Sequence, residues 1–174
     1  MKILLIGPQG SGKSTQAKLL AEYLKIPVVS TGEIFRKLSQ EKVGFGQIIR
    51  TILDEGHLVD DQTTYKIVKD RLSQPDCKMG FVMDGYPRNI HQKELFDPDF
   101  DKVIYLKVPN EEIVKRLMVR GREDDTKESI QTRLNLYYEQ TQPLLTYYKQ
   151  KGILVEVDGT GDIPKIQDEI KKFL

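Results

Sequence analysis

A glycine-rich stretch near the N-terminus constrains this chain more than any other feature. Residues 7–15 read GPQGSGKST and match the pattern G-x-x-x-x-G-K-[ST], whose fixed positions are occupied by Gly7, Gly12, Lys13 and Ser14. Residues 2–6 form a short apolar run typical of a buried strand, and residues 13–24 carry apolar side chains at helical spacing. The stretch is therefore expected to form a strand-to-helix turn, a context that a chance GKS sequence would lack.

The composition of this turn suits a phosphate ligand. Glycines allow backbone N–H groups to turn inward and approach phosphate oxygens without interference from a Cβ atom. A helix that begins there adds unpaired N–H groups and the positive end of its dipole. Lys13 would reach the β- and γ-phosphates, and the Ser14 hydroxyl would ligate Mg²⁺. The motif predicts a nucleoside triphosphate ligand but does not specify the reaction.

Length and charge exclude several classes of protein. A chain of 174 residues suits a single domain with room for a sizeable core. The net charge of +1 gives no electrostatic reason to expect nucleic acid or a membrane as a partner. Cys77 is the only cysteine, so an internal disulfide and a cysteine-based zinc site are not expected. Met1 leads directly into the first apolar run, which leaves no room for a signal peptide, and we expect a cytoplasmic protein.

The fold class follows from the alternation of short apolar runs with helical patterns. The runs that we expect to form strands are residues 2–6, 27–29, 81–83, 103–108 and 153–157. This alternation predicts an α/β protein with a parallel sheet covered by helices on both faces. With the glycine-rich turn, it predicts a P-loop three-layer sandwich built on a five-stranded sheet.

A small inserted lobe is expected between the second strand and the next core helix. Ser30 and Glu33 have the spacing of a helix-capping box, and a second helical pattern covers residues 43–53. Two helices exceed what one crossover connection needs, so we assign residues 30–59 to the lobe. The core would then comprise residues 1–29, 60–118 and 126–174, with a connecting turn at 119–125.

Polar residues follow the third expected strand. Residues 84–88 read DGYPR, so an aspartate at a strand end precedes a turn and an arginine. Ligands of open α/β sheets bind beyond the carboxyl ends of the strands. Asp84 and Arg88 are therefore expected beside the glycine-rich turn if this strand neighbours the first one. Without the glycine-rich turn, Asp84 would be interpreted as a residue of its own local turn and Arg88 as a solvated charge.

Arginines gather around a helix–turn–helix in the last third of the chain. Asn110 can cap a helix that runs to about Arg120, and Asp125 with Glu128 has capping spacing for the next helix, which Pro143 is expected to bend. The cluster consists of Arg116, Arg120, Arg122 and Arg133. Arginine suits bidentate contacts with phosphate, so the cluster favours a phosphate site over a merely solvated face.

These segments together resemble the adenylate kinases of the nucleoside monophosphate kinase family. The matching segments are GPQGSGKSTQ, STGEIFR, GHLVD, GFVMDGYPRNIHQ, RGREDD, QTRL and VDGTGD, in family order and across nearly the whole chain. The resemblance implies a reversible reaction in which Mg-ATP and AMP give two molecules of ADP. It also implies an inserted AMP-binding lobe and a lid of the short type.

The resemblance implies a role for each matching residue. The ATP phosphates would be held by Gly10, Ser11, Gly12, Lys13, Ser14 and Thr15. The ATP base would meet Arg116 and the loop that contains Gly161, with Arg120 also on the donor side. AMP would be held by Thr31, Arg36, Val59, Gly85, Arg88, Gln92, Arg122 and Arg133. The transferring group would be met by Lys13, Arg88, Arg120, Arg122 and Arg133, and Mg²⁺ by Ser14 and, through water, by Asp84.

Two departures from the family pattern stand out. Gln9 occupies a position at which many members carry proline or glycine. Only Gly121, Arg122 and Glu123 stand between Arg120 and Asp124, where long family members insert a large lobe. Because this connection is short, it argues against a large closing movement of the lid. The arginines of the family pattern are retained. The connection is also too short to hold a zinc site, so Mg²⁺ is the metal that we expect.

The alternative functions differ in the group that accepts the phosphoryl group. An AMP phosphate has a second pKa of about 6, is largely dianionic at neutral pH and needs no general base. A kinase for a pyrimidine monophosphate, or for an alcohol with Asp84 as the base, would be a related possibility, and a nucleotide-switched assembly ATPase a more distant one. Gln92 and Thr31 favour AMP over CMP and UMP, because relatives that use pyrimidine monophosphates typically carry asparagine and alanine there. A monomer is expected.

Overall fold

The computed structural model describes residues 1–41, 43–121 and 126–174. Its centre is a five-stranded sheet in the order β2-β3-β1-β4-β5, and every neighbouring pair runs parallel. The strands are β1 (Lys2–Ile6), β2 (Val28–Ser30), β3 (Phe81–Asp84), β4 (Lys102–Lys107) and β5 (Leu154–Asp158). The predicted α/β sheet is confirmed, and the observed strand ends differ from the expected ones by one residue at most.

The register of the central strands explains where polar groups gather. Leu5 pairs with Asp84 on β3 and with Ile104 on β4, so the carboxyl ends of these strands lie at one edge of the sheet. β1 continues from Ile6 into the glycine-rich turn at this edge. Because β3 neighbours β1, the expectation that Asp84 lies beside that turn is met.

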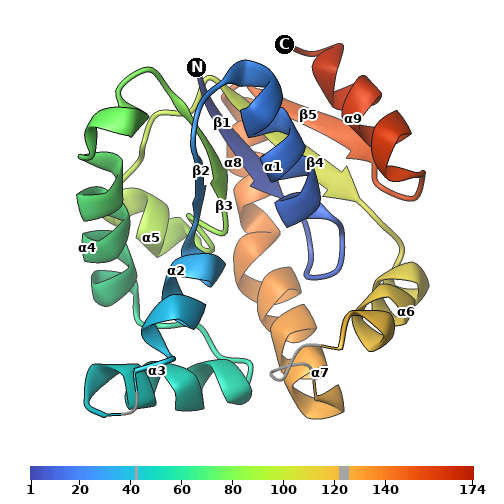
Figure 1. Ribbon diagram of the computed structural model, residues 1–174. Coiled ribbons are helices and arrows are strands. Elements are labelled where there is room, and N and C mark those ends of the chain that lie inside the picture. The colour runs from blue at the N-terminus through green and yellow to red at the C-terminus, as the bar shows by residue number, and fades with distance from the viewer. Residues whose placement is uncertain (42, 122–125) are drawn as a thin grey trace.

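Helices cover both faces of the sheet (Figure 1). On one face α1 (Lys13–Leu24) and α9 (Ile163–Lys171) bury Leu20 and Ile170 against the strands. On the other face α4 (Asp61–Leu72) and α8 (Pro143–Gln150) bury Val68 and Leu144. The strands are apolar on both sides because both faces are covered, as is typical of parallel sheets. None of the helices in the described residues is long and apolar enough for a membrane span.

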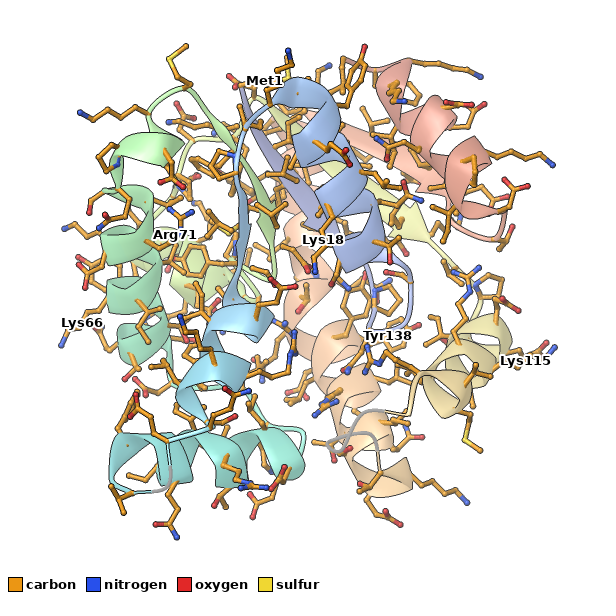
Figure 2. All side chains as sticks on the ribbon, in the orientation of Figure 1. Met1, Lys18, Lys66, Arg71, Lys115 and Tyr138 are labelled. Atoms are coloured by element: carbon orange, nitrogen blue, oxygen red, sulfur yellow. The ribbon has the colours of Figure 1, made fainter. Side chains whose placement is uncertain are left out.

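Two helices stand off the sheet beside α4. They are α2 (Thr31–Leu38) and α3 (Phe45–Asp54), and Phe35, Ile49 and Val59 form a small core of their own between them. Ser30 caps α2 as expected, by accepting a hydrogen bond from Glu33 N at 3.4 Å. The Glu33 carboxylate forms an ion pair with Lys18 of α1 at 2.7 Å, which ties α2 to the core (Lys18 is labelled in Figure 2).

The helices after β4 correct two predicted caps. α6 (Asn110–Arg120) has Pro109 at its N-cap position, without a side-chain capping bond, so Asn110 is its first residue. The Asn110 side chain accepts a hydrogen bond from the hydroxyl of Tyr138, which is labelled in Figure 2. α7 (Lys127–Leu136) has Thr126 as its N-cap, in a reciprocal capping box with Ser129. Aspartate and threonine both occur as N-caps, so one residue of register separates the two possibilities. The predicted cap, Asp125, lies outside the described residues.

The long helical stretch is interrupted before Pro143 rather than at it. A π-helical turn, Tyr137–Thr141, separates α7 from α8, and Gln142 N donates to Tyr137 O across it at 2.9 Å. Pro143 is the first residue of α8, a position at which its missing N–H removes no helical hydrogen bond. The interruption lies beside the cleft described below. The remaining elements are α5 (Ile90–Leu95) and a 3₁₀ turn (Pro75–Cys77).

Candidate active site

A cleft of about 350 Å³ opens at the carboxyl ends of β1 and β3. Its wall is formed by the glycine-rich turn, the start of α2, the end of α3 and the segment after β3, and by side chains of α5, α6 and α7. In Figure 1 the α2–α3 pair and the α6–α7 pair flank this edge of the sheet. We call the part formed by residues 7–15 the phosphate-loop end and the part formed by Thr31, Gly85, Arg88 and Gln92 the Gln92 end.

The phosphate-loop end is shaped by backbone conformation. Gly10 and Gly12 have φ angles of 84° and 94°, in the left-handed region that other residues rarely adopt. A Cβ atom at Gly10 would lie 2.9 Å from Leu117 Cγ, so α6 packs directly on the loop. Gly12 precedes α1 and has no side chain to cap the helix, which leaves the first N–H groups of α1 available for an anion. Lys13 Nζ donates to Pro8 O at 2.9 Å across the loop.

Oxygen ligands suited to Mg²⁺ converge beside the loop. The Ser14 hydroxyl donates to Asp84 Oδ2 at 2.6 Å, and the Ser30 hydroxyl lies 3.4 Å from the same oxygen. Asp84 is buried, with 5% of its surface exposed. A hydroxyl and a buried carboxylate are hard oxygen donors, and Mg²⁺ is usually bound by one or two such groups together with substrate phosphates and water. The residues present therefore fit the ion, although no cluster of three or more His, Cys, Asp or Glu forms within the described residues.

Arginine side chains from several elements share the cleft. Arg36 of α2, Arg88 after β3 and Arg133 of α7 all line it. Burial lowers the pKa of the Arg88 guanidinium, the charge of Asp84 raises it, and the charges of Arg133 and Arg36 lower it further. Arg88 nevertheless stays ionised, because arginine starts from so high a pKa. Several cations held close together form a site for a strongly charged anion.

Gln9 links the phosphate loop to two arginines of the cleft, Arg120 and Arg133. Its amide orientation is set by its surroundings, and with the oxygen toward the guanidinium groups it accepts from Arg120 Nη2 and Arg133 Nη1, both at 2.7 Å. Arg133 Nη2 also donates to Leu53 O in the last turn of α3 at 2.8 Å. Arg133 therefore joins α7 both to the loop and to the inserted helices. The departure at Gln9 thus bears directly on the geometry of the site.

The Gln92 end is held together by side-chain hydrogen bonds. Thr31 Oγ1 donates to Gly85 O at 2.9 Å, and Arg88 Nε donates to the same carbonyl at 3.0 Å. Gly85 has a φ of 96°, and a Cβ atom there would lie only 2.5 Å from Thr31 Oγ1. Thr141, in the π-helical turn, donates to Arg88 O at 2.7 Å. These bonds fix the direction in which Arg88 enters the cleft.

Gln92 is buried and hydrogen-bonded on both sides of its amide. Its Oε1 accepts from Arg88 N at 2.8 Å, and its Nε2 donates to Asp61 Oδ1 at 2.9 Å. Arg88 itself precedes α5, whose N-cap is Asn89, so the two residues do not share one helix. The two residues still meet, because the cap brings the backbone of Arg88 back onto the first turn.

Most of the predicted site residues line the cleft together. They are Gly10, Gly12, Lys13, Ser14, Thr15, Thr31, Arg36, Val59, Asp84, Gly85, Arg88, Gln92, Arg116, Arg120 and Arg133. Ser11 belongs to the loop but is fully buried behind it. Gly161 does not line the cleft; it lies in the loop between β5 and α9, whose Gly159 approaches Ser11 O. Arg122 lies outside the described residues.

Sequence reasoning missed Asp61, Thr64 and Thr141. Thr64 and Thr141 line the cleft, and Asp61 supports Gln92 from behind. Asp61 and Thr64 lie three residues apart at the start of α4, a spacing that puts them on one face, but nothing in the sequence indicates that this face meets α5. Thr141 is in the cleft because of the π-helical turn, for which the sequence carries no recognised signal.

Comparisons with known proteins agree with this geometry. The adenylate kinase family model matches residues 5–153. An adenylate kinase of Bifidobacterium longum is 44% identical over 185 aligned positions, which cover all of both chains. Adenylate kinases of Clostridium kluyveri and Methanosarcina mazei are 37% and 38% identical over 212 and 211 positions, which cover 100% of this chain and 98% of each relative. These alignments exceed 174 positions, so the relatives carry residues where this chain has none. The chain belongs to the adenylate kinase family.

Proposed function

We propose that this chain catalyses the reversible transfer of a phosphoryl group from Mg-ATP to AMP, giving two molecules of ADP. The observation that carries the proposal is the single cleft in which the phosphate loop, Asp84 and arginines of separate elements meet. Phosphoryl transfer depends mainly on in-line placement of two anions and on cancellation of their charge. The name of these relatives, adenylate kinase, agrees with this assignment.

The phosphate-loop end would bind the donor. Residues 10–15 would hold the ATP phosphates through backbone N–H groups, with Lys13 on the β- and γ-phosphates. Arg116 would pack against the ATP base, and its ion pair with Glu112 at 2.9 Å supports a fixed position for its side chain. The loop that contains Gly161 would border the adenine, supported by the contact between Gly159 and the phosphate loop.

The Gln92 end would bind the acceptor. Arg36 and Arg88 would hold the AMP phosphate, and Thr31, Val59, Gly85 and Gln92 would surround its base. Arg120 and Arg133 would meet the transferring group, together with Arg122, which lies outside the described residues. The shared contact of Arg120 and Arg133 with Gln9 supports this, because it holds both guanidinium groups over the phosphate loop. In this assignment residues 30–59 form the AMP-binding lobe and residues 119–125 a short lid.

Mg²⁺ would be held by the Ser14 hydroxyl and, through water, by Asp84. When bound, the ion supplies charge neutralisation on the β- and γ-phosphates. Ser14 and Ser30 orient the buried Asp84 carboxylate toward this position, and the charge of Arg88 is close enough to Asp84 to be coupled to it. Asp84 is not needed as a general base, because a dianionic acceptor phosphate has no proton to lose.

The proposal includes further expectations about partners. The enzyme is proposed to act as a cytoplasmic monomer, with Mg²⁺ and no zinc, and with no nucleic acid or membrane partner. The net charge of +1 and the lone Cys77 support these expectations. Removal of tightly bound metal followed by addition of Mg²⁺ alone should restore full activity, and unfolding on removal of zinc would contradict it.

The decisive experiment is an acceptor panel. Initial rates of diphosphate formation from Mg-ATP are measured with AMP, CMP, UMP and GMP. We expect AMP to be strongly preferred, because buried hydrogen-bonding groups reject bases that leave them unpaired. Equal use of CMP or UMP would overturn the acceptor while leaving the kinase assignment. A complete lack of transfer to any monophosphate would overturn the proposed function itself.

A further inference from the structure

The carboxylate of Asp61 lies directly behind the Gln92 amide. Asp61 is the first residue of α4, and Gln92 lies in α5, which packs against α4 (Figure 1). Gln92 lines the cleft and has only 1% of its surface exposed, whereas Asp61 is not among the described residues that line it. Asp61 is thus positioned to act on a ligand only through Gln92.

The two hydrogen bonds of Gln92 define the orientation of its amide. A backbone N–H can only donate, so the atom that faces Arg88 N at 2.8 Å must be the amide oxygen. An ionised carboxylate can only accept, so the atom that faces Asp61 Oδ1 at 2.9 Å must be the amide nitrogen. A reversed amide would mismatch both partners. One N–H and one oxygen lone pair remain on Gln92 for a ligand.

Asp61 is itself held as an acceptor. Its Oδ1 also accepts from Asn89 Nδ2 at 3.0 Å, and its Oδ2 lies 2.7 Å from His91 Nδ1. Partial burial raises the pKa of Asp61, but the hydrogen bonds from His91, Asn89 and Gln92 outweigh it, and the net pKa lies below its usual range. The carboxyl group therefore stays ionised near neutral pH and has no proton to donate to Gln92.

We propose that Asp61 fixes the polarity of the Gln92 amide and thereby sets the preference of this enzyme for a 6-aminopurine monophosphate over a 6-oxopurine monophosphate. The inference rests on the proposed function, with AMP bound at the Gln92 end. A 6-aminopurine offers an N–H donor beside a ring-nitrogen acceptor, and a 6-oxopurine offers the reverse, a carbonyl acceptor beside an N–H donor. An amide of fixed polarity complements one edge, and an amide free to reverse complements both. Asp61 is a positioning residue in this scheme.

The test compares AMP with IMP, which share the phosphate and ribose and differ in the polarity of the base edge. The kcat/KM values for both are measured by chromatography of the diphosphate products, for the wild type and for Asp61→Ala and Asp61→Asn. In Asp61→Ala only Arg88 N still orients the amide, so the AMP:IMP ratio should fall on the order of 10-fold, the effect of one lost hydrogen-bond partner. Asp61→Asn keeps an acceptor oxygen and should keep the ratio within about 2-fold of the wild type.

The two variants and a control distinguish an effect of the Gln92 amide polarity from an effect of the Asp61 charge and from a loss of stability. Both variants remove the negative charge, so an electrostatic effect on the shared phosphate would change AMP and IMP alike. Asp60→Ala is the matched control, because it removes the N-cap bond of α4, from Thr63 N to Asp60 Oδ1 at 2.9 Å, without touching Gln92. It should lower the thermal midpoint and leave the AMP:IMP ratio unchanged.

The outcomes distinguish this inference from the proposed function. No transfer to AMP by the wild type would overturn the proposed function. An AMP:IMP ratio in Asp61→Ala within 2-fold of the wild type, or an equal fall in Asp61→Asn, would overturn the role of Asp61 alone. If Asp61→Ala does not fold, the role of Asp61 is tested by hydrogen exchange of side-chain amides in the nucleotide-free wild type. The Gln92 amide should exchange far more slowly than that of the exposed Gln40, and similar exchange rates would overturn the inference.

Discussion

The two ends of the cleft are formed by different kinds of structure. The phosphate-loop end is formed by one continuous segment, and its shape comes from left-handed glycines and the first turn of α1. The Gln92 end is assembled from α2, α4, α5 and the segment after β3, and its shape comes from hydrogen bonds between side chains and carbonyls. The first end is therefore shaped mainly by backbone conformation and the second mainly by side-chain hydrogen bonds, and each also holds one feature of the other kind: the Gln9 amide at the first end and the left-handed Gly85 at the second.

The largest effect is expected at Arg88, in the Gln92 end. Arg88→Ala should lower kcat on the order of 10²–10³-fold, the usual loss when a donor to a developing charge is removed. Arg88→Lys should not restore full activity, because the bidentate fork is lost. The AMP:IMP ratio should stay unchanged in both variants, since Gln92 is oriented by the backbone N–H of Arg88 and not by its side chain.

The control for this prediction is Arg50→Ala on the exposed surface of α3. Its steady-state constants should match those of the wild type. A kcat for Arg88→Ala close to the wild-type value would mean that Arg88 does not contact the transferring group. A collapse of the AMP:IMP ratio would instead mean that its side chain also supports the base site.

A smaller effect is expected at the junction formed by Gln9. Gln9→Leu removes the oxygen that accepts from Arg120 and Arg133, and kcat should fall about 10- to 100-fold, as for a charge-assisted hydrogen bond. If Gln9 acts through Arg133, the loss in Gln9→Leu with Arg133→Lys should be smaller than the sum of the two single losses in free energy. Strictly additive losses would show that Gln9 and Arg133 act independently.

A pair of glycine substitutions tests the comparison more directly. Gly10→Ala introduces a Cβ 2.9 Å from Leu117 Cγ, and Gly85→Ala introduces one 2.5 Å from Thr31 Oγ1. The first should raise the KM for ATP about 5- to 10-fold and the second the KM for AMP by a similar factor. At each site, relief of the close contact and of about 1–2 kcal/mol of left-handed strain has to displace the backbone that meets the ligand. Gly152→Ala is the control, because its φ is 74° and a Cβ would meet nothing within 4 Å. It should lower stability without changing either KM, and a common change in both KM values at Gly10 and Gly85 would contradict separate ends.

The same difference explains what the sequence could predict. The phosphate-loop end was predictable, because strand, glycines and helix are contiguous and their spacing carries the geometry. The alternation of apolar runs likewise predicted the sheet. At the Gln92 end, Arg88 was expected near the loop because it follows the third strand, whereas Thr31 and Gln92 were assigned through a family resemblance. The hydrogen-bond partners of all three were not predicted. Asp61 precedes Gln92 by 31 residues, and only the packing of α4 on α5 brings them together.

Helix ends show the other limit of sequence reasoning. Asp125 with Glu128 and Thr126 with Ser129 both have capping spacing, and the N-cap preference for aspartate over threonine favoured the register that the structure does not adopt. The π-helical turn before Pro143 depends on i→i+5 hydrogen bonds that no residue pattern signals, and it brings Thr141 to the carbonyl of Arg88. Such details depend on tertiary contacts and not on local composition.

The smallest expected effect concerns pH and again separates the two ends. Hydrogen bonds, chiefly from His91, lower the pKa of Asp61 despite partial burial, so its folded pKa lies below its unfolded value. The stability that this shift contributes is fully present above the unfolded pKa, about 3.9 for aspartate, and is lost as pH falls through the folded pKa. The free energy of unfolding of the wild type should therefore exceed that of Asp61→Asn most at pH 6, and the difference should shrink between pH 5 and pH 3, roughly the window around that pKa. His91→Ala removes one of the hydrogen bonds that lower the pKa of Asp61 against the effect of burial, and it should weaken this pH dependence. Urea unfolding of the three proteins across this range is the measurement, and a difference that stays constant with pH would show that the ionisation of Asp61 contributes nothing to stability.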